Sequence, residues 1–226
     1  MAPIGTFYGA PTQRQSVIVR SVAAITGQEL IIPEFKMGVT NKAPEFLARF
    51  PAGKIPAFED SDGFLLTEGA TIAHYLASLK PESGLIGRDV KEEAAIGQWV
   101  HFAETDIQPN IETIYYFIVG YASGYSPEFS QWLYNRAIIA LNQVEKYLSD
   151  GGREYLVGGR LTVADLTVAA VVQFALRVIL GKAEREALPR TIAHLERIVG
   201  DARLKGEFPP QEYLEVRLDG SPLKKD

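Results

Sequence analysis

The sequence predicts two domains of different classes, an α/β domain with a four-stranded mixed sheet followed by an all-helical bundle. Three observations support this. Strand-like runs alternate with helical patterns over residues 1–80. Residues 81–89 hold a proline and two glycines with little periodicity, which is typical of a linker. Residues 90–219 carry apolar side chains at helical spacing, and residues 220–226 form a polar tail that we expect to be disordered.

The first unit is predicted to be a strand, a helix and a strand. Residues 6–8 (TFY) are a short strand, and residues 13–26 have apolar positions at helical spacing. Gly27 suits the left-handed position that ends such a helix. Residues 30–32 (LII) are continuously apolar, which predicts a strand covered on both faces.

Residues 41–79 add a helix, a loop, a hairpin and a helix. Lys54-Ile55-Pro56 leads into a strand at residues 57–59. Because proline cannot donate to a sheet ladder, Pro56 fits a tight turn with a cis bond, which leaves the Ile55 backbone outside the sheet. Ser61-Asp62-Gly63 is a hairpin turn before a second strand at residues 64–66. The resulting βαβ-α-ββα order implies a mixed sheet of thioredoxin type.

The helical domain begins with a long pattern at residues 92–117, which Pro109 is expected to kink or break. Pro127 suits the first turn of the next helix, which should end near residue 149. Thr162 and Asp165 form a variant capping box at the start of another helix. Further helices are predicted at residues 189–199 and 201–205.

Composition excludes several function classes. A net charge of −5 argues against binding to nucleic acid or to an acidic membrane, both of which need clustered Lys and Arg. The absence of cysteine excludes disulfides and thiolate nucleophiles and fits a reducing compartment. No secretory signal is visible at the N-terminus, and the longest apolar run, residues 166–180, is too short to span a bilayer. We therefore expect a cytoplasmic protein.

Motifs for other chemistries are missing from the sequence. There is no Walker loop and no GxGxxG, and the three histidines show no metal-ligand spacing, so we expect no metal. A thioredoxin-like fold without CxxC cannot perform dithiol exchange with its own residues. At Glu68-Gly69, however, a carboxylate precedes a helix N-terminus, a pair that attracts the ammonium and carboxylate of one α-amino acid.

Four segments carry a resemblance to a known family: residues 41–50 (NKAPEFLARF), 51–58 (PAGKIPAF), 98–109 (QWVHFAETDIQP) and 155–168 (YLVGGRLTVADLTV). The chain resembles the glutathione transferase superfamily over essentially its whole length. It is most similar to the transferase-like domain of the translation elongation factor-one gamma subunit. The family pattern is a cis-proline loop followed by a Glu-Ser step into a helix, and this chain departs from it with Gly69 in place of the serine.

The resemblance implies a glutathione site. The Gly69 N–H would hold the γ-glutamyl carboxylate, Glu68 the ammonium, and the Ile55 main chain the cysteinyl backbone. The missing serine hydroxyl should weaken binding by about 1 kcal/mol. The implied glutathione-binding residues are Asn41, Lys54, Ile55, Pro56, Glu68 and Gly69, with Asn41 and Lys54 at the glycyl end.

A transferase must also stabilise the thiolate of glutathione, for which it needs a hydrogen-bond donor or a cation. Family members use a Tyr, Ser or Cys at or after the first strand, but Gly9 and Ala10 stand there in this chain. The catalytic candidates are Tyr8 and Arg14, with Gln13 third. Taken alone, Tyr8 is more often a core or edge aromatic than a catalyst, and Arg14 is by default a solvated surface charge.

Two further groups have alternative interpretations. The aromatic residues 115–117 and Tyr121 either line an acceptor pocket or pack between helices, and the packing role is favoured. Glu104 and Asp106 either face a ligand in the partner subunit of a dimer or lie on a solvated helix face, which is favoured.

Three functions remain open. The leading one is a homodimeric glutathione transferase for detoxification, with glutathione as co-substrate and a hydrophobic electrophile as acceptor. The alternative is a non-catalytic scaffold that binds a nucleotide-exchange subunit in translation. The elongation-factor subunit continues into a second domain beyond the length of this chain, so the sequence is either a stand-alone protein or a fragment. A third is a ligandin that sequesters apolar molecules without turnover.

Overall fold

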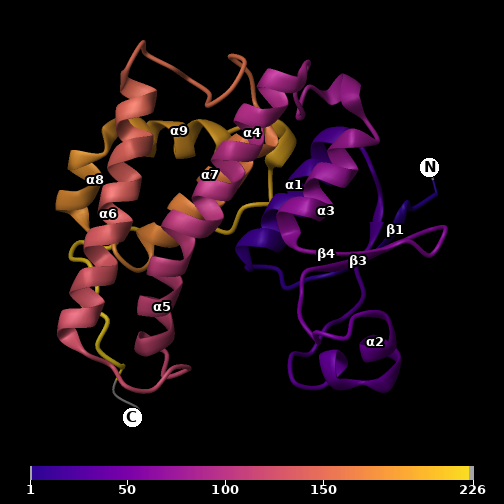
Figure 1. Ribbon diagram of the computed structural model, residues 1–226, viewed down its shortest axis with the longest axis horizontal. Coiled ribbons are helices and arrows are strands. Elements are labelled where there is room, and N and C mark those ends of the chain that lie inside the picture. Colours follow the sequence, from indigo (N-terminus) through magenta and orange to yellow (C-terminus); the bar gives the residue numbers. More distant parts are fainter. Residues whose placement is uncertain (1, 224–226) are drawn as a thin grey trace.

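The computed structural model describes residues 2–223 and has a sheet domain beside a helical domain (Figure 1). The sheet has the strand order β2-β1-β3-β4. Strand β1 pairs in parallel with β2 and antiparallel with β3, and β3 pairs antiparallel with β4. The predicted fold class, a thioredoxin-like domain followed by a helical one, is confirmed. The strands are β1 (Gly5–Tyr8), β2 (Leu30–Ile31), β3 (Ala57–Asp60) and β4 (Leu65–Thr67).

Helices cover both faces of this sheet. Helices α1 (Arg14–Thr26) and α3 (Gly69–Ser78) lie on one face, and α2 (Pro44–Arg49) lies on the other (Figure 1). Alternation along the strands explains the two layers, because successive side chains point to opposite faces. Phe7 and Phe58 join the core beneath α1 and α3, whereas Tyr8 and Ala57 join a smaller cluster around α2.

Local signals in this domain are largely confirmed. Gly27 adopts the left-handed conformation, with φ 67°, at the end of α1. The Ile55–Pro56 peptide bond is cis. The Asp60 carboxylate accepts the N–H groups of Asp62 and Phe64, which fixes the hairpin turn but leaves Phe64 outside β4.

The expectation that residues 30–32 form a strand covered on both faces is wrong. Strand β2 is only two residues long and lies at the edge of the sheet, where it pairs with β1 alone. Ile31 is 51% exposed and Ile32 49% exposed. A continuous apolar run is therefore not sufficient evidence for a central strand.

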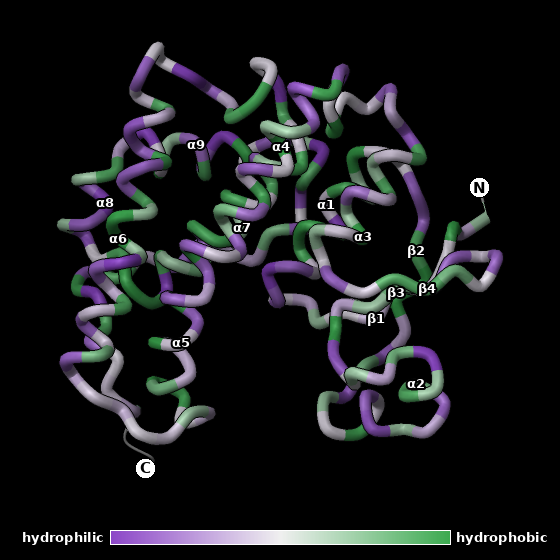
Figure 2. The backbone as a smooth tube through the Cα atoms, viewed as in Figure 1, coloured by the Kyte–Doolittle hydropathy of each residue, from purple (hydrophilic) through white to green (hydrophobic). Residues whose placement is uncertain are grey.

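The helical domain is organised around α7 (Val163–Leu176), which packs against α1, α3, α4 and α9. Nearly every residue of α7 is buried, and Figure 2 shows hydrophobic residues along it in the middle of the molecule. A helix that is apolar all round requires such a central position. The other helices are α4 (Val90–Phe102), α5 (Gln108–Ile118), α6 (Pro127–Ser149), α8 (Lys182–Ala187) and α9 (Pro189–Val199).

The break expected near Pro109 is a π-helical turn at Ala103–Ile107 between α4 and α5. Proline lacks an N–H and its ring crowds the preceding turn, so the regular ladder cannot continue through it. The Asn110 side chain donates to the Asp106 carbonyl at 2.6 Å and satisfies a backbone acceptor there.

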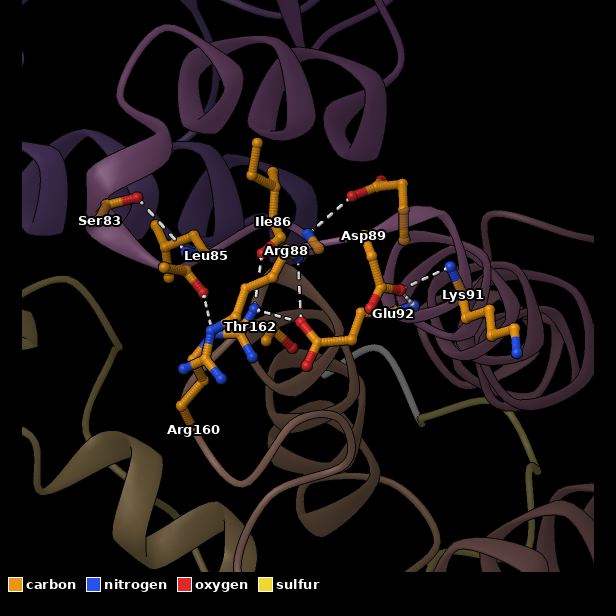
Figure 3. A network of polar contacts seen from close by, with 12 residues as sticks. Ser83, Leu85, Ile86, Arg88, Asp89, Lys91, Glu92, Arg160 and Thr162 are labelled. Atoms are coloured by element: carbon orange, nitrogen blue, oxygen red, sulfur yellow. Dashed lines mark hydrogen bonds and ion pairs between the residues drawn. The ribbon is translucent and has the colours of Figure 1, made fainter.

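Arg160 ties the segment between the domains to the helical domain (Figure 3). Its guanidinium donates to the carbonyls of Gly84 and Ile86 at 2.9 and 2.8 Å and to the Glu92 carboxylate at 2.8 Å. Arg160 thereby lowers the pKa of Glu92. Beside it, Leu85 is buried and its carbonyl accepts the Val163 N–H. We still propose residues 81–89 as the domain boundary, although they are not a loose connection.

The chain after α9 returns along the helical domain. Ser130 donates to the Asp219 carbonyl at 2.7 Å, and the Leu223 N–H donates to the Ile118 carbonyl at 2.9 Å. Gly220 is buried and packs so closely on α6 that a side chain there would overlap the Ser130 hydroxyl. The expected disorder is therefore wrong for residues 220–223, and residues 224–226 lie outside the described residues. Within residues 2–223, no helix is long and apolar enough to cross a membrane.

Asp165 confirms the predicted capping box and does more than cap α7. Its carboxylate is fully buried and accepts the Thr162 N–H and hydroxyl, each at 2.8 Å. It also accepts the Leu156 N–H at 2.8 Å and Nε2–H of His194 on α9 at 2.9 Å. One buried carboxylate therefore joins two helices and the loop before α7.

We predict that Asp165→Asn lowers the free energy of unfolding by about 3 kcal/mol, because an amide NH₂ replaces an acceptor oxygen among buried donors. The matched control is Asp89→Asn at the exposed cap of α4, where the retained oxygen still accepts the N–H groups of Lys91 and Glu92. That change should cost less than about 0.5 kcal/mol. Urea unfolding measures both, and equal losses would contradict the role of Asp165.

Candidate functional site

A cleft of about 670 Å³ lies between the sheet domain and α5. We call it the interdomain cleft. The sheet domain supplies the start of α1, the loops around residues 37–42 and 52–56, and the end of β4, while Gln108, Glu112 and Tyr116 of α5 form the opposite wall. The structure brings six predicted site residues to this cleft: Gln13, Asn41, Lys54, Ile55, Pro56 and Glu68.

The cis-proline turn leaves the Ile55 backbone available. Neither its N–H nor its C=O pairs with the sheet in the described part of the chain. The carbonyl accepts Nε2–H of Gln13 at 2.9 Å, and the oxygen of the same amide accepts the Ser16 hydroxyl at 2.8 Å. The Ile55 N–H therefore remains to pair with an extended ligand, as an added strand would.

Asn41 and Lys54 have different roles. Asn41 is buried, and its amide spans two loops: it donates to the Gly53 carbonyl at 2.9 Å and accepts the Gly38 N–H at 2.6 Å. Asn41 thus shapes the cleft. Lys54 is exposed, and its ammonium makes no ion pair or hydrogen bond with any residue from 2 to 223, so its charge is available to an anion.

Glu68 lies exposed at the entrance of α3 with φ 66°, the only positive φ among the described non-glycine residues. Such a conformation costs about 1–3 kcal/mol and is often found at ligand sites. No side chain caps α3, and the N–H groups of residues 69–71 have no partner among the described residues. A free carboxylate therefore stands beside unpaired amides at one end of the cleft.

Gly69 is buried behind Glu68 and does not line the cleft. A Cβ at this position would stand 2.4 Å from Cβ and 3.1 Å from Cα of Gln15 on α1. The departure from the family pattern is therefore more than a missing hydroxyl, because the Gln15 side chain occupies the space that a side chain at position 69 would need.

Tyr8 points to the other face of the sheet. Its ring packs against Phe46 and Phe50 with centroids 5.4 and 5.9 Å apart, and its hydroxyl accepts an Arg49 N–H at 2.9 Å. Tyr8 does not line the cleft, so the structure gives it no role in activating a thiol there. The alternative of a core aromatic describes Tyr8 correctly.

The alternative that Arg14 is a solvated charge is wrong. Its side chain is only 15% exposed and pairs with Glu112 of α5 at 2.6 Å. The guanidinium lies 4.0 Å from the ring centroid of Phe174 on α7. Glu112 faces the cleft, whereas Arg14 lies behind it. Arg14 therefore acts on the cleft through Glu112.

The aromatic residues 115–117 of α5 and Tyr121 after it divide between the two expected roles, lining a pocket and packing between helices. Tyr116 and Tyr121 line the cleft with centroids 4.9 Å apart. Tyr115 instead packs on Phe174 of α7, and Phe117 is buried. Burial, reinforced by a hydrogen bond to Glu112, raises the pKa of Tyr116 to about 12. The Tyr116 hydroxyl is therefore protonated at neutral pH and can donate a hydrogen bond.

Glu104 is not on a solvated face. It is half-buried and lines a separate hollow of about 270 Å³ with His74 and His101. Burial raises the pKa of Glu104, and the negative charge of Glu68 raises it further. Among residues 2–223, no group of three or more His, Cys, Asp or Glu side chains is arranged to hold a metal ion.

The arrangement fits a zwitterionic, extended ligand with one further anionic end. In such a ligand the ammonium would suit Glu68, one carboxylate the α3 amides, the extended backbone the Ile55 N–H, and the second anion Lys54. Sequence reasoning missed Gln15 and Glu112, which also line the cleft. Gly69 was the signal for Gln15, since an unexpected glycine inside a motif indicates close approach of another backbone or side chain.

Comparisons with known proteins show the family of this chain. Residues 3–78 match the family described as glutathione S-transferase, N-terminal domain, and residues 123–206 match glutathione S-transferase, C-terminal domain. The chain belongs to the glutathione S-transferase family. This confirms the resemblance found in the sequence.

Particular relatives are of two kinds. A glutathione S-transferase-like protein of Fusarium sp is 36% identical over 222 residues, which are 96% of this chain and 98% of that protein. Elongation factor 1-gamma of Homo sapiens is 32% identical over 191 residues, which are 83% of this chain but only 42% of that protein. The crystal structure of the glutathione transferase URE2P6 from Phanerochaete chrysosporium, in complex with oxidized glutathione, has the same fold. Its TM-score is 0.82 at 22% identity, over 91% of this chain and 95% of that one.

We predict that Tyr116 ionises near pH 12, measured as the difference in tyrosinate absorbance between the parent and Tyr116→Phe on alkaline titration. The unfolded chain ionises this group at its usual value of 10.0, so the stability that Tyr116 contributes is full below pH 10 and is lost as the pH rises to about 12. Glu112→Gln removes a negative charge and should lower the pKa of Tyr116. An unchanged pKa would contradict the contact with Glu112.

Proposed function

We propose that this protein is a cytoplasmic glutathione transferase that binds glutathione in the interdomain cleft and conjugates its thiolate to an electrophile held against α5. One observation supports this above all: the unpaired Ile55 N–H and Glu68, the residue that precedes the uncapped start of α3, belong to the lining of a single cleft. Neighbouring structures of this fold contain glutathione, which agrees with the proposal.

Each part of glutathione has a partner in this proposal. Glu68 holds the γ-glutamyl ammonium, and the N–H groups at the start of α3, including that of Gly69, hold its carboxylate. The cysteinyl backbone pairs with Ile55, next to Pro56. Lys54 holds the glycyl carboxylate, and Asn41 contributes by fixing the loops that carry Lys54.

The acceptor site is formed by Tyr116 and Tyr121, whose rings contact each other, and by Met37 of the sheet domain. Aromatic faces at this position favour a flat hydrophobic electrophile. The Glu112 carboxylate is neutralised by Arg14, so the acceptor wall carries no net charge from this pair.

Thiol activation is assigned to Gln13. Its amide contacts the Ile55 carbonyl, the position at which the cysteinyl residue would dock, and it stands at the start of α1, where N–H groups favour a negative charge. Arg14 supports this end of α1 as a positioning residue, through Glu112. Tyr8 has no part in the reaction.

For binding, we expect Glu68→Gln to raise the dissociation constant for glutathione about 10- to 100-fold, because a charge-assisted contact is worth about 1.5–3 kcal/mol. Isothermal titration calorimetry measures it. Glu186→Gln, an exposed position on α8, is the matched control and should bind as the parent does. Failure of the parent to bind millimolar glutathione would refute the proposed function.

For catalysis, we expect Gln13→Ala to lower kcat for conjugation of a chlorodinitro aromatic by at least about tenfold, a typical loss when one donor to a developing anion is removed. Tyr8→Phe should leave kcat unchanged, since the Tyr8 hydroxyl faces Arg49 on the opposite side of the sheet. A large loss in Tyr8→Phe with none in Gln13→Ala would reverse the assignment.

A second candidate is the scaffold role, which the likeness to elongation factor 1-gamma supports. The chain spans about two-fifths of the length of that relative, so partners of the whole factor need not be shared. Retention of a purified nucleotide-exchange subunit, with no glutathione binding, would favour this role. We also propose that the chain forms a homodimer. Light scattering of the purified protein would measure its mass and test this.

A further inference from the structure

We propose that Gln15 positions the γ-glutamyl end of glutathione, in place of the side chain that position 69 lacks. The inference rests on the proposed function, because it assumes that glutathione occupies the interdomain cleft. It assigns the residue that makes this cleft specific for a ligand carrying a free α-carboxylate beside its ammonium, that is, for γ-glutamyl peptides.

The first step is steric. The aliphatic part of Gln15 lies directly over Gly69, and a Cβ at position 69 would be 2.4 Å from Cβ and 3.0 Å from Cγ of Gln15. Real Cβ atoms do not approach other heavy atoms so closely, and the contacted atoms belong to the rigid root of the side chain rather than its free end. The volume that a serine would fill is therefore taken by Gln15.

The second step concerns the carboxamide. Gln15 is half-buried in the second position of α1 and lines the interdomain cleft together with Thr67 and Glu68. Burial and the negative charge of Glu68 raise the pKa of the nearby Glu104, and Gln15 lowers it. Gln15 therefore lies near both carboxylates, beside the start of α3 where the backbone amides are unpaired.

The third step is electrostatic. Glu68 and Glu104 together suit an ammonium, but they would repel the carboxylate that an α-amino acid carries on the same carbon. An amide NH₂ has two N–H donors, so Gln15 can direct one of them at the ligand carboxylate. This donor, with the α3 N–H groups, offsets the repulsion.

A packing role alone does not account for a glutamine here. The nearby Gln13 has its amide held by the Ile55 carbonyl and the Ser16 hydroxyl, and its second N–H is the one assigned to the thiolate, so a separate donor is needed for the carboxylate. An aliphatic residue would cover Gly69 as well as Gln15 does, but it would leave the carboxylate of the ligand without a donor from α1.

The experiment is calorimetric titration of the full chain with two ligands, glutathione and its analogue that lacks the γ-glutamyl α-carboxylate. For Gln15→Leu we expect about a tenfold higher dissociation constant for glutathione and no change for the analogue. The matched control is Gln143→Leu at an exposed position of α6, which should bind both ligands as the parent does. Urea unfolding of each variant establishes that it is folded.

A second pair of variants tests the steric step. Gly69→Ser alone should weaken glutathione binding, because its Cβ overlaps Gln15, whereas Gly69→Ser combined with Gln15→Gly removes the overlapping Cβ and should recover affinity. In this double variant the serine at position 69 also supplies a hydroxyl at the start of α3, which can replace the lost Gln15 amide as a donor. Parent-like binding by Gly69→Ser alone would overturn the proposed packing.

The outcomes separate the two proposals. No binding of glutathione by the parent overturns the proposed function and this inference with it. Binding by the parent that Gln15→Leu leaves unchanged overturns this inference alone. An equal loss for both ligands in Gln15→Leu shows a general disturbance of the cleft and also overturns it.

Discussion

The contact between the first turns of α1 and α3 is the constraint on which the cleft depends. It holds Gln13 and Gln15 on one helix against Glu68 on the other, and it excludes any Cβ at position 69. The polar groups at this end of the cleft therefore come from two separate segments, the starts of α1 and α3, which meet because the helices pack without an intervening side chain. A small displacement of either helix would alter the amide donors and the carboxylate together.

Buried polar groups supply the rigidity that this geometry requires. Asp165 joins α7 to α9 and to the loop before α7, and α7 in turn supports α1 and α3 from the helical side. The ion pair of Arg14 and Glu112 connects the start of α1 to α5 across the domain boundary. A buried charge left without its partner is costly, so these contacts specify one arrangement of the two domains more strongly than apolar packing alone.

Much of the fold could be predicted from sequence because its signals are local. Gly27 ends α1, Pro56 follows a cis bond, and Thr162 with Asp165 starts α7, each decided within a few neighbouring residues. The site was predicted only where the motif itself supplies the contact, as at Ile55 and Glu68. The side to which Tyr8 points depends on which face of the sheet borders the cleft, and the burial of Arg14 depends on α5 and α7, which lie about a hundred or more residues away along the chain. Alternation and periodicity carry no such information.

The bonds that Arg160 makes to the connecting segment have a consequence for how molecules reach the cleft. Two backbone carbonyls and one carboxylate fix this segment to the helical domain, so it cannot serve as a hinge. Opening by separation of the two domains would instead have to break the ion pair of Arg14 and Glu112 and the packing of α1 on α7. The cleft is therefore preformed, and a ligand would reach it at its mouth, past the exposed Met37 and Tyr121, without movement of a whole domain.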